Sequence, residues 1–351
     1  MSIRCGIIGT PNAGKSTLFN ALTHSDVPAE SFPFCTIEPN TGIVAVRDAR
    51  LLAIAQVVGV ETQVPVTLEF VDIAGLVEGA SRGEGLGNRF LSHIREMDVI
   101  AHVVGCFDSQ FDWQSDVDVV NLELILADLA TVGKALDKAG RRARIGEKSQ
   151  KIAVSILTRV LSALENETSV RELELSPEEK EFVDQLHLLT AKRIFYVMNI
   201  DEDQLDQNVS LQKFSQSSVP TVAICAELES ELAKMPEQDQ DSFRIEMGGD
   251  CSAIDRVVQA AYSVLELRTF FTFNESEVRA WAIPSGTTAR QAAGRIHTAM
   301  ETGFIRVEVM DCGDLVVLGS EQAVKKAGKL RIEGKTYLPQ DGEILRVRFN
   351  S

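Results

Sequence analysis

Near its N-terminus the chain reads Gly9-Thr10-Pro11-Asn12-Ala13-Gly14-Lys15-Ser16-Thr17. This stretch fits the phosphate-binding pattern in which a glycine and four further residues precede Gly-Lys-Ser or Gly-Lys-Thr. The apolar run Ile3 to Ile8 predicts a buried strand before it, and the residues from Leu18 to Leu22 continue as a helix. This order predicts a loop whose backbone N–H groups wrap a phosphate at the N-terminus of a helix. A chance glycine-rich turn is the alternative.

Two side chains of this loop have expected roles in nucleotide chemistry. Lys15 is expected to bridge the β- and γ-phosphates, and the Ser16 hydroxyl to coordinate Mg²⁺.

Composition bounds the class of protein. The chain has 351 residues and a net charge of −16, which predicts two or three domains and disfavours generic adhesion to nucleic acid. No apolar run reaches the ~20 residues of a membrane span, and the early strand leaves no room for a signal peptide. The 6 cysteines form no Cys-x-x-Cys pair, so we expect reduced thiols and a cytoplasmic protein that does not contact membranes.

Two further segments are typical of a nucleotide switch. Thr36 lies in a proline-containing loop, residues 31–40, and is expected to turn toward Mg²⁺ and the γ-phosphate. A predicted strand from Val66 to Val71 ends in Asp72-Ile73-Ala74-Gly75. Asp72 is expected to hold Mg²⁺ through water, and the Gly75 N–H to meet the γ-phosphate. The glycine-rich residues 78–87 are expected to become ordered with the γ-phosphate.

Leu76 follows Gly75, where many GTPases carry a glutamine that orients the attacking water. Leucine cannot orient water, so another group or a partner must do so.

A helical hairpin is predicted from apolar residues spaced by three and four, first from Leu122 to Leu136 and then from Val154 to Leu164. The expected turn between them, Lys134 to Lys151, contains seven basic residues and only Asp137 and Glu147 as acids. Either a solvated helix tip or an RNA-contacting tip explains this charge.

After the hairpin, Ser176 is predicted to cap a helix from about Pro177 to Thr190. A predicted strand from Arg193 then ends in Asn199-Ile200-Asp201-Glu202. GTPases place Asn-Lys-x-Asp here, and its Asp pairs with guanine. Glu202 carries a longer carboxylate that should misplace this contact.

The C-terminal part differs in character. From about Phe270 the pattern predicts a small mixed sheet with one main helix, Thr288 to Met300. Its predicted strands are 278–283, 304–309, 315–318 and 344–349. Residues 270–351 contain 11 basic and 10 acidic residues by count, so this is the less acidic part.

The chain closely resembles the YchF family of Obg-like ATPases, a TRAFAC-class group of P-loop proteins. The resemblance covers essentially the whole length. It is carried by the phosphate loop, Phe32-Pro33-Phe34-Cys35-Thr36-Ile37-Glu38-Pro39-Asn40, Asp72-Ile73-Ala74-Gly75-Leu76, Gly83-Glu84-Gly85-Leu86-Gly87-Asn88, Asn199-x-x-Glu202 and Gly334-Lys335-x-Tyr337.

The resemblance implies an α/β fold. It consists of a Ras-like P-loop NTPase domain, an inserted helical coiled-coil hairpin and a C-terminal β-grasp (TGS) domain. The expected boundaries are 1–120 and 191–268 for the two parts of the G domain, 121–190 for the insertion and 269–351 for the TGS domain.

The resemblance also implies a function. We expect a Mg²⁺-dependent switch that hydrolyses the β–γ phosphoanhydride of ATP in preference to GTP and that associates with the ribosome in translation or stress. The residues implied are Asn12, Ala13, Gly14, Lys15, Ser16 and Thr17 for phosphates, Ser16, Thr36 and Asp72 for Mg²⁺, Asn199, Ile200 and Glu202 at the base, and Lys15, Thr36 and Gly75 for catalysis.

Two other functions are open. One is a GTP-specific Obg-type GTPase in which Glu202 has adapted to guanine. The other is a ribosome- or RNA-binding factor with incidental hydrolysis, which contacts RNA through residues 134–151 and the TGS domain.

Overall fold

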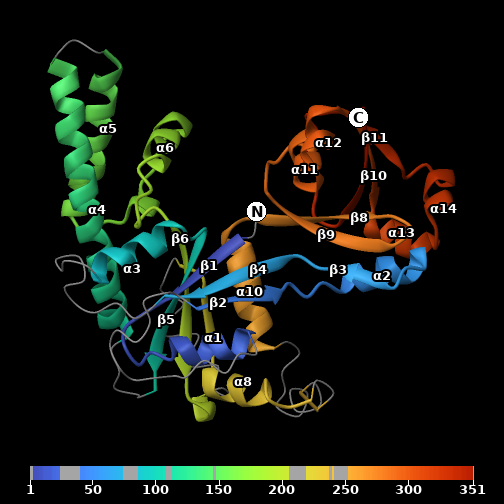
Figure 1. The fold of residues 1–351 in the computed structure, drawn as a ribbon, viewed down its shortest axis with the longest axis horizontal. Helices are drawn as coiled ribbons and strands as arrows, with labels where there is room; N and C mark the ends of the chain where they lie inside the picture. The colour runs from blue at the N-terminus through green and yellow to red at the C-terminus, as the bar shows by residue number, and fades with distance from the viewer. Residues whose placement is uncertain are drawn as a thin grey trace. The chain divides into compact units, whose positions relative to one another are not determined.

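The computed structural model describes residues 3–23, 40–73, 86–107, 113–144, 148–204, 219–236, 239–240 and 252–350, without the side chains of 86–89, 144, 148 and 149. The chain divides into two compact units. Unit 1 contains Met1–Val44 and Glu69–Ala261, and unit 2 contains Ala45–Leu68 and Tyr262–Ser351. Figure 1 shows the helices and strands of both units.

Unit 1 is built on a six-stranded sheet with the order β2-β4-β1-β5-β6-β7. The strands are β1 (Ile3–Ile8), β2 (Asn40–Ala45), β4 (Thr67–Asp72), β5 (Val99–Cys106), β6 (Arg193–Ile200) and β7 (Thr221–Ile224). The pairs β1–β5, β5–β6 and β6–β7 are parallel. The strands predicted at Ile3 to Ile8, at Val66 to Val71 and from Arg193 are confirmed as β1, β4 and β6. In a parallel sheet, the loops that follow these strands meet at one edge.

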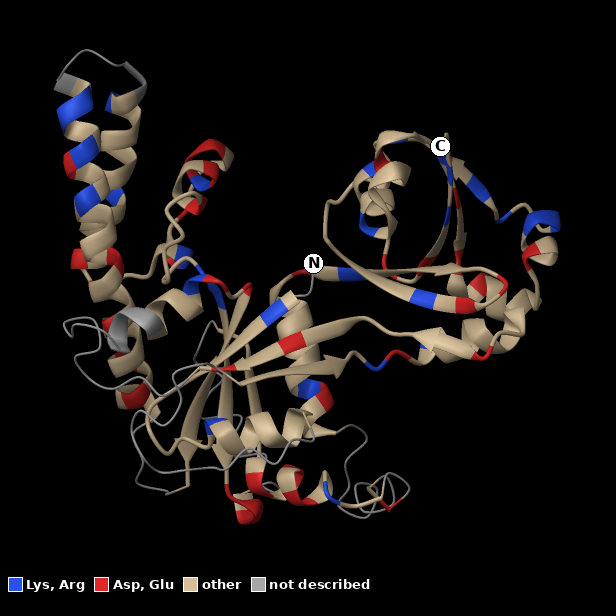
Figure 2. Cartoon of the chain, viewed as in Figure 1, with Lys and Arg blue, Asp and Glu red and all other residues tan. Residues whose placement is uncertain are grey.

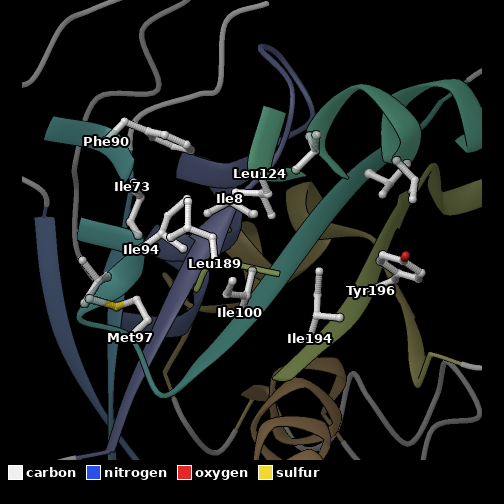
Figure 3. Close-up of a cluster of buried hydrophobic side chains, with 14 of the residues drawn as sticks. Ile8, Ile73, Phe90, Ile94, Met97, Ile100, Leu124, Leu189, Ile194 and Tyr196 are labelled. Atoms are coloured by element: carbon white, nitrogen blue, oxygen red, sulfur yellow. The ribbon is translucent and has the colours of Figure 1, made fainter. Parts of the chain in front are cut away.

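Helices cover this sheet. They are α1 (Lys15–Thr23), α3 (Leu86–Arg95), α8 (Ala226–Leu232) and α10 (Ala253–Val264), with the short η2 (Glu202–Gln204) after β6. Figure 3 shows part of the core, in which Ile94 and Met97 belong to one buried cluster with Ile8 and Ile100 from the sheet. Leu124 and Leu189 belong to the same cluster, so the start of the hairpin is packed into the core of unit 1.

The predicted hairpin consists of α4 (Trp113–Arg144) and α5 (Lys148–Glu165), which lie side by side (Figure 1). Their apolar seam includes Val132, Leu157, Val160 and Leu164, all buried. The prediction of a turn over Lys134 to Lys151 was wrong for most of its length. Helix α4 extends to Arg144 and α5 begins at Lys148, so all seven basic residues of the stretch are helical.

The helix predicted from Pro177 is α6 (Pro177–Asp184), preceded by η1 (Val170–Glu172). Ser176 caps it as predicted, through a reciprocal pair of hydrogen bonds with Glu179. The prediction that it continues to Thr190 was wrong. His187 has a φ of 50°, and the following amide groups are bound by a buried side chain of α4.

That side chain is Asp128, which is fully buried. Its carboxylate accepts hydrogen bonds from the Leu189 N–H at 2.9 Å, the Thr190 N–H at 2.8 Å and the Thr190 hydroxyl at 2.7 Å. Burial raises the pKa of Asp128, and these hydrogen bonds oppose the shift. Asp128 therefore fastens the segment before β6 to the hairpin.

Unit 2 has its own six-stranded sheet, with the order β11-β10-β12-β8-β9-β3. The strands are β3 (Thr62–Val64), β8 (Leu267–Phe273), β9 (Glu277–Pro284), β10 (Phe304–Asp311), β11 (Arg331–Glu333) and β12 (Glu343–Phe349). The helices are α2 (Ala49–Val58), α11 (Ala289–Ile296), α12 (Thr298–Thr302), α13 (Cys312–Leu318) and α14 (Glu321–Lys326). Its pairs are parallel for β12–β8 and β3–β9 and antiparallel for β8–β9 and β10–β12. The predicted mixed sheet is confirmed.

Two details of unit 2 correct the sequence-based expectation. The predicted helix over 288–300 is divided at His297, which ends α11 and caps α12. The predicted strand at 315–318 is helix α13. Its N-cap Asp311 accepts from the N–H groups of Gly313 and Asp314, and Gly319 ends it with a φ of 73°. These caps outweigh the strand preference of two adjacent valines.

Residues 45–68 belong to unit 2, whereas the sequence placed them within the first part of the G domain. Strand β3 pairs with β9, and α2 packs against α13 and β9. Arg50 of α2 makes ion pairs with Asp48 and with Asp341, the latter at 2.5 Å. A short amphipathic segment does not reveal a strand partner more than two hundred residues away, so this grouping had no signal in the sequence.

Candidate nucleotide-binding site

The loop between β1 and α1 has the backbone geometry of a phosphate cradle. Gly9, Asn12 and Gly14 have φ values of 154°, 63° and 91°. A Cβ at Gly9 would lie 2.2 Å from the Val103 carbonyl oxygen of β5. Glycine is therefore required where the loop passes the neighbouring strand.

Lys15 starts α1, and its side chain turns back into the loop. Its Nζ donates to the Thr10 carbonyl oxygen at 2.6 Å, and the residue is 8% exposed. Burial lowers the pKa of Lys15, while the nearby carboxylates of Asp72 and Asp116 raise it. The ammonium group is thus held inside the loop with carboxylates as its counter-charges.

Ser16 and Asp72 come together although they are separated by 56 positions. The Ser16 hydroxyl donates to Asp72 Oδ2 at 3.0 Å. Burial raises the pKa of Asp72, and the Ser16 hydrogen bond and the Lys15 charge lower it. The second carboxylate oxygen, Oδ1, is buried and has no hydrogen-bond partner among the described residues.

These oxygens fit a hard divalent cation. Mg²⁺ prefers carboxylate and hydroxyl oxygens and is usually held by one or two protein groups together with waters and phosphates. The described residues contain no cluster of three or more His, Cys, Asp or Glu side chains at metal-ligand spacing. The Ser16 hydroxyl and the Asp72 carboxylate are oxygens of the kind that such a cation takes.

The end of β6 meets the phosphate loop through Asn199. Its Nδ2 donates to the Ala13 carbonyl oxygen at 3.1 Å, and its Oδ1 accepts from the Ala226 N–H at 2.9 Å. A Cβ at Gly14 would lie 2.0 Å from Asn199 Nδ2. Asn199 thus ties the loop to the segment after β7, which is a structural role that the sequence did not suggest.

The other two residues at the expected base site differ in exposure. Ile200 is 2% exposed and its side chain belongs to the core of unit 1, so only its backbone can face a ligand. Glu202 begins η2 and is exposed. Thr36 and Gly75, which were predicted to hold Mg²⁺ and the γ-phosphate, lie outside the described residues.

A second connection to the phosphate loop comes from the hairpin. The Thr10 hydroxyl donates to Asp116 Oδ2 at 2.7 Å. Asp116 lies in the first turn of α4, where an acid is common because it interacts favourably with the helix dipole. Its contact with the loop therefore had no distinctive sequence signal.

The far end of the hairpin is basic. Figure 2 shows Lys and Arg gathered on the part of α4 and α5 that points away from the sheet. The exposed residues Lys134, Lys138, Arg141, Arg142 and Lys151 lie in these helices. Within the described ranges, no helix combines the length and the apolar character that crossing a membrane requires.

Two family models match the chain. One, described as a 50S ribosome-binding GTPase, covers residues 4–132. The other is a YchF C-terminal domain, described as a protein of unknown function (DUF933), and covers residues 267–350.

Curated relatives match over the full length. The chain is 44% identical over 362 aligned residues to "Ribosome-binding ATPase YchF" of Escherichia coli O157:H7, with 100% of both chains covered. It is 42% identical over 365 residues to the protein of the same name from Bacillus subtilis, again with 100% of both covered. A solved structure, "Structure of the Schizosaccharomyces pombe YchF GTPase", superposes with a TM-score of 0.85 at 32% identity and covers 99% of this chain and 98% of its own.

Proposed function

The chain belongs to the YchF family, and from this premise we propose that it is a Mg²⁺-dependent ATPase that binds the ribosome and switches with its nucleotide state. The observation that carries the proposal is the convergence of Lys15, Ser16 and Asp72 beside the phosphate loop. The ribosome-binding part rests on the names of the full-length relatives and on the basic end of the hairpin.

The described residues suggest a division of labour. Lys15 would bind the β- and γ-phosphates, and the backbone N–H groups from Asn12 to Thr17 would cradle them. Ser16 would bind Mg²⁺ directly and Asp72 through water. Thr36 and Gly75, which lie outside the described residues, would complete the site. Bound Mg²⁺ supplies positive charge against the charge that develops on the phosphates.

Base selection is proposed to favour adenine. The Ile200 side chain is buried, so its backbone is what remains to meet an adenine edge. Glu202 replaces the aspartate that pairs with guanine in GTPases, and a misplaced polar contact costs orders of magnitude in preference.

A GTPase is the second candidate, favoured by the name of the similar yeast structure, which calls that protein a GTPase. A ribosome-binding factor with incidental hydrolysis is the third, favoured by the exposed basic residues of α4 and α5. Competition between ATP and GTP distinguishes the ATPase from the GTPase. Ribosome binding by variants of the basic residues tests the third candidate.

The domain assignment is also a proposal. We infer a G domain in 1–120 and 191–268, a helical insertion in 121–190 and a TGS domain in 269–351, with residues 45–68 packed into the same compact unit as the last of these. A cytoplasmic location would follow from ribosome binding.

Lys15→Ala tests the phosphate-binding assignment. Loss of a buried cation that contacts two phosphates should weaken ATP binding by about 100-fold or more. Lys180→Ala, at an exposed position on α6, is the matched control and should bind ATP as the wild type does. Undiminished ATP affinity in Lys15→Ala, measured by isothermal titration calorimetry with Mg²⁺, would contradict the assignment.

A further inference from the structure

The contact between Thr10 and Asp116 joins two elements that nucleotide chemistry alone does not require to meet. Thr10 belongs to the phosphate loop, and Asp116 belongs to the first turn of the hairpin helix α4. Their side chains are 106 positions apart in the sequence and 2.7 Å apart in space. Both residues are half-buried, so their hydrogen bond is only partly exposed to competition from water.

A short chain of hydrogen bonds continues from this contact to Lys15. The Thr10 hydroxyl is held by Asp116, and the Thr10 carbonyl oxygen accepts from Lys15 Nζ at 2.6 Å. Threonine is stiff at χ1 because its Cβ is branched. Fixing its hydroxyl therefore restricts the backbone to which Lys15 is bonded.

Electrostatics point to the same coupling. Two carboxylates act on the Lys15 ammonium, those of Asp72 and Asp116. Asp72 has a second role, because it accepts from Ser16 and fits the metal site. Asp116 instead accepts from the Thr10 hydroxyl, so the second carboxylate acts on the loop from the hairpin helix.

The helix that carries Asp116 is continuous over 32 residues, from Trp113 to Arg144. At about 1.5 Å per residue it is about 48 Å long. One end holds Asp116, and the other end holds the exposed basic residues Arg141 and Arg142. Because Asp116 and these basic residues lie on one continuous helix, a displacement of its basic end would also move the side chain that holds Thr10.

We propose that Asp116 is a positioning residue that couples helix α4 to the phosphate loop, because it holds Thr10 and through Thr10 the Lys15 that binds a nucleoside triphosphate. The inference rests on the proposed function only for the identity of the ligand. The positioning itself is a property of the ligand-free protein.

A double-mutant cycle on the full chain tests the coupling. The variants are Thr10→Val, Asp116→Ala and the double variant, with affinity for Mg²⁺-ATP as the readout. Each single variant should bind about tenfold more weakly, the worth of one hydrogen bond to a charged acceptor. The double variant should be no weaker than the weaker single, because both changes remove the same interaction.

Two further variants separate positioning from other roles. Asp116→Asn keeps an oxygen acceptor for Thr10 but removes the charge, so it should recover part of the lost affinity. Asp118→Ala, at an exposed position on the same helix, should bind as the wild type does. Independent effects that multiply in the double variant, or affinities within twofold of the wild type with only a lower melting temperature, would overturn the proposal.

Hydrogen exchange of the nucleotide-free protein makes the test independent of the proposed ligand. In Thr10→Val and in Asp116→Ala, amides of residues 9–16 should exchange about tenfold faster than in the wild type and in Asp118→Ala. Unchanged exchange in this loop would overturn the positioning role. Failure of the wild type to bind any nucleotide would instead refute the proposed function, and the exchange rates would still decide the role of Asp116.

Discussion

Among the described residues, His102 is a buried histidine whose ring makes no hydrogen bond. It lies in β5, is fully buried, and contacts Tyr196 edge to face. Both of its ring nitrogens lack hydrogen-bond partners among the described residues. Burial, with smaller contributions from Arg171 and Lys15, lowers the pKa of His102 from 6.5 to about 3.

This shift makes unit 1 sensitive to acid. The unfolded chain takes up a proton on His102 near pH 6.5 and the folded chain only near pH 3, so stability falls as the pH falls through that window. Between pH 7 and pH 5 the loss from this one group is about 2 kcal/mol. His102→Leu should remove that part of the acid sensitivity.

The measurement is urea unfolding at pH 7 and pH 5 in a Trp281→Phe background. The chain has 2 tryptophans, so Trp113 then reports on unit 1 alone. His187→Asn is the control, because His187 is exposed and Asn tolerates its positive φ. Equal acid sensitivity in His102→Leu and the wild type would show that His102 does not titrate in this window.

The residue types of the phosphate-binding site could be predicted from the sequence more readily than the contacts between them. The types and spacing of Lys15, Ser16 and Asp72 were recognisable because each lies at the end of a strongly patterned strand or helix. The contacts of Thr10 with Asp116 and of Asn199 with Ala13 were not, because they join positions 106 and 186 apart. Such contacts depend on the order of strands in the sheet, which local patterns do not specify.

Among the elements, the hairpin is bound through Asp128 to the segment that precedes β6. Replacement with alanine leaves the buried N–H groups of Leu189 and Thr190 without their acceptor. We expect Asp128→Ala to destabilise unit 1 by about 3 kcal/mol or more. Asp137→Ala, at an exposed position on the same helix, should change stability by less than about 0.5 kcal/mol.

Urea unfolding followed by Trp113 fluorescence compares the two variants. A loss in Asp128→Ala no larger than in Asp137→Ala would mean that water or a shifted side chain satisfies these amides, and that the hairpin is held by apolar packing alone.

The basic end of the hairpin makes a separate prediction about ribosome binding. Arg141→Glu with Arg142→Glu should weaken binding and should flatten its salt dependence, by about one unit of log–log slope for each phosphate that the protein no longer neutralises. Lys180→Glu with Lys234→Glu changes the net charge equally at exposed positions elsewhere in unit 1.

Cosedimentation with ribosomes over a range of salt concentrations measures both effects. Equal weakening by the two charge reversals would assign the effect to net charge, and unchanged binding would remove the hairpin end from the interface.

Elements were predicted well where periodicity and caps agreed and poorly where they conflicted. Ser176 and Pro177 marked the start of α6 correctly. Val316 and Val317 suggested a strand, but Asp311 and Gly319 cap a helix around them. The basic stretch of the hairpin suggested a turn, although helices continue through most of it because charged side chains are compatible with a solvated helix.

At the scale of the whole molecule, the family relationship places the chain among proteins named as ribosome-binding ATPases. Local patterns predicted a G domain in two parts and a separate C-terminal part, and this division stays a prediction. They did not reveal that residues 45–68 belong to unit 2, because the pairing of β3 with β9 is a long-range choice. The base preference likewise depends on several segments that come together only in the folded protein.

The nucleotide preference of the protein is measured by equilibrium competition between ATP and GTP with Mg²⁺, against one labelled nucleotide. We expect ATP to bind more tightly than GTP, because the Ile200 side chain is buried and Glu202 carries a longer carboxylate than the aspartate that pairs with guanine. Tighter binding of GTP would contradict it and would mean that Glu202 reaches guanine after all.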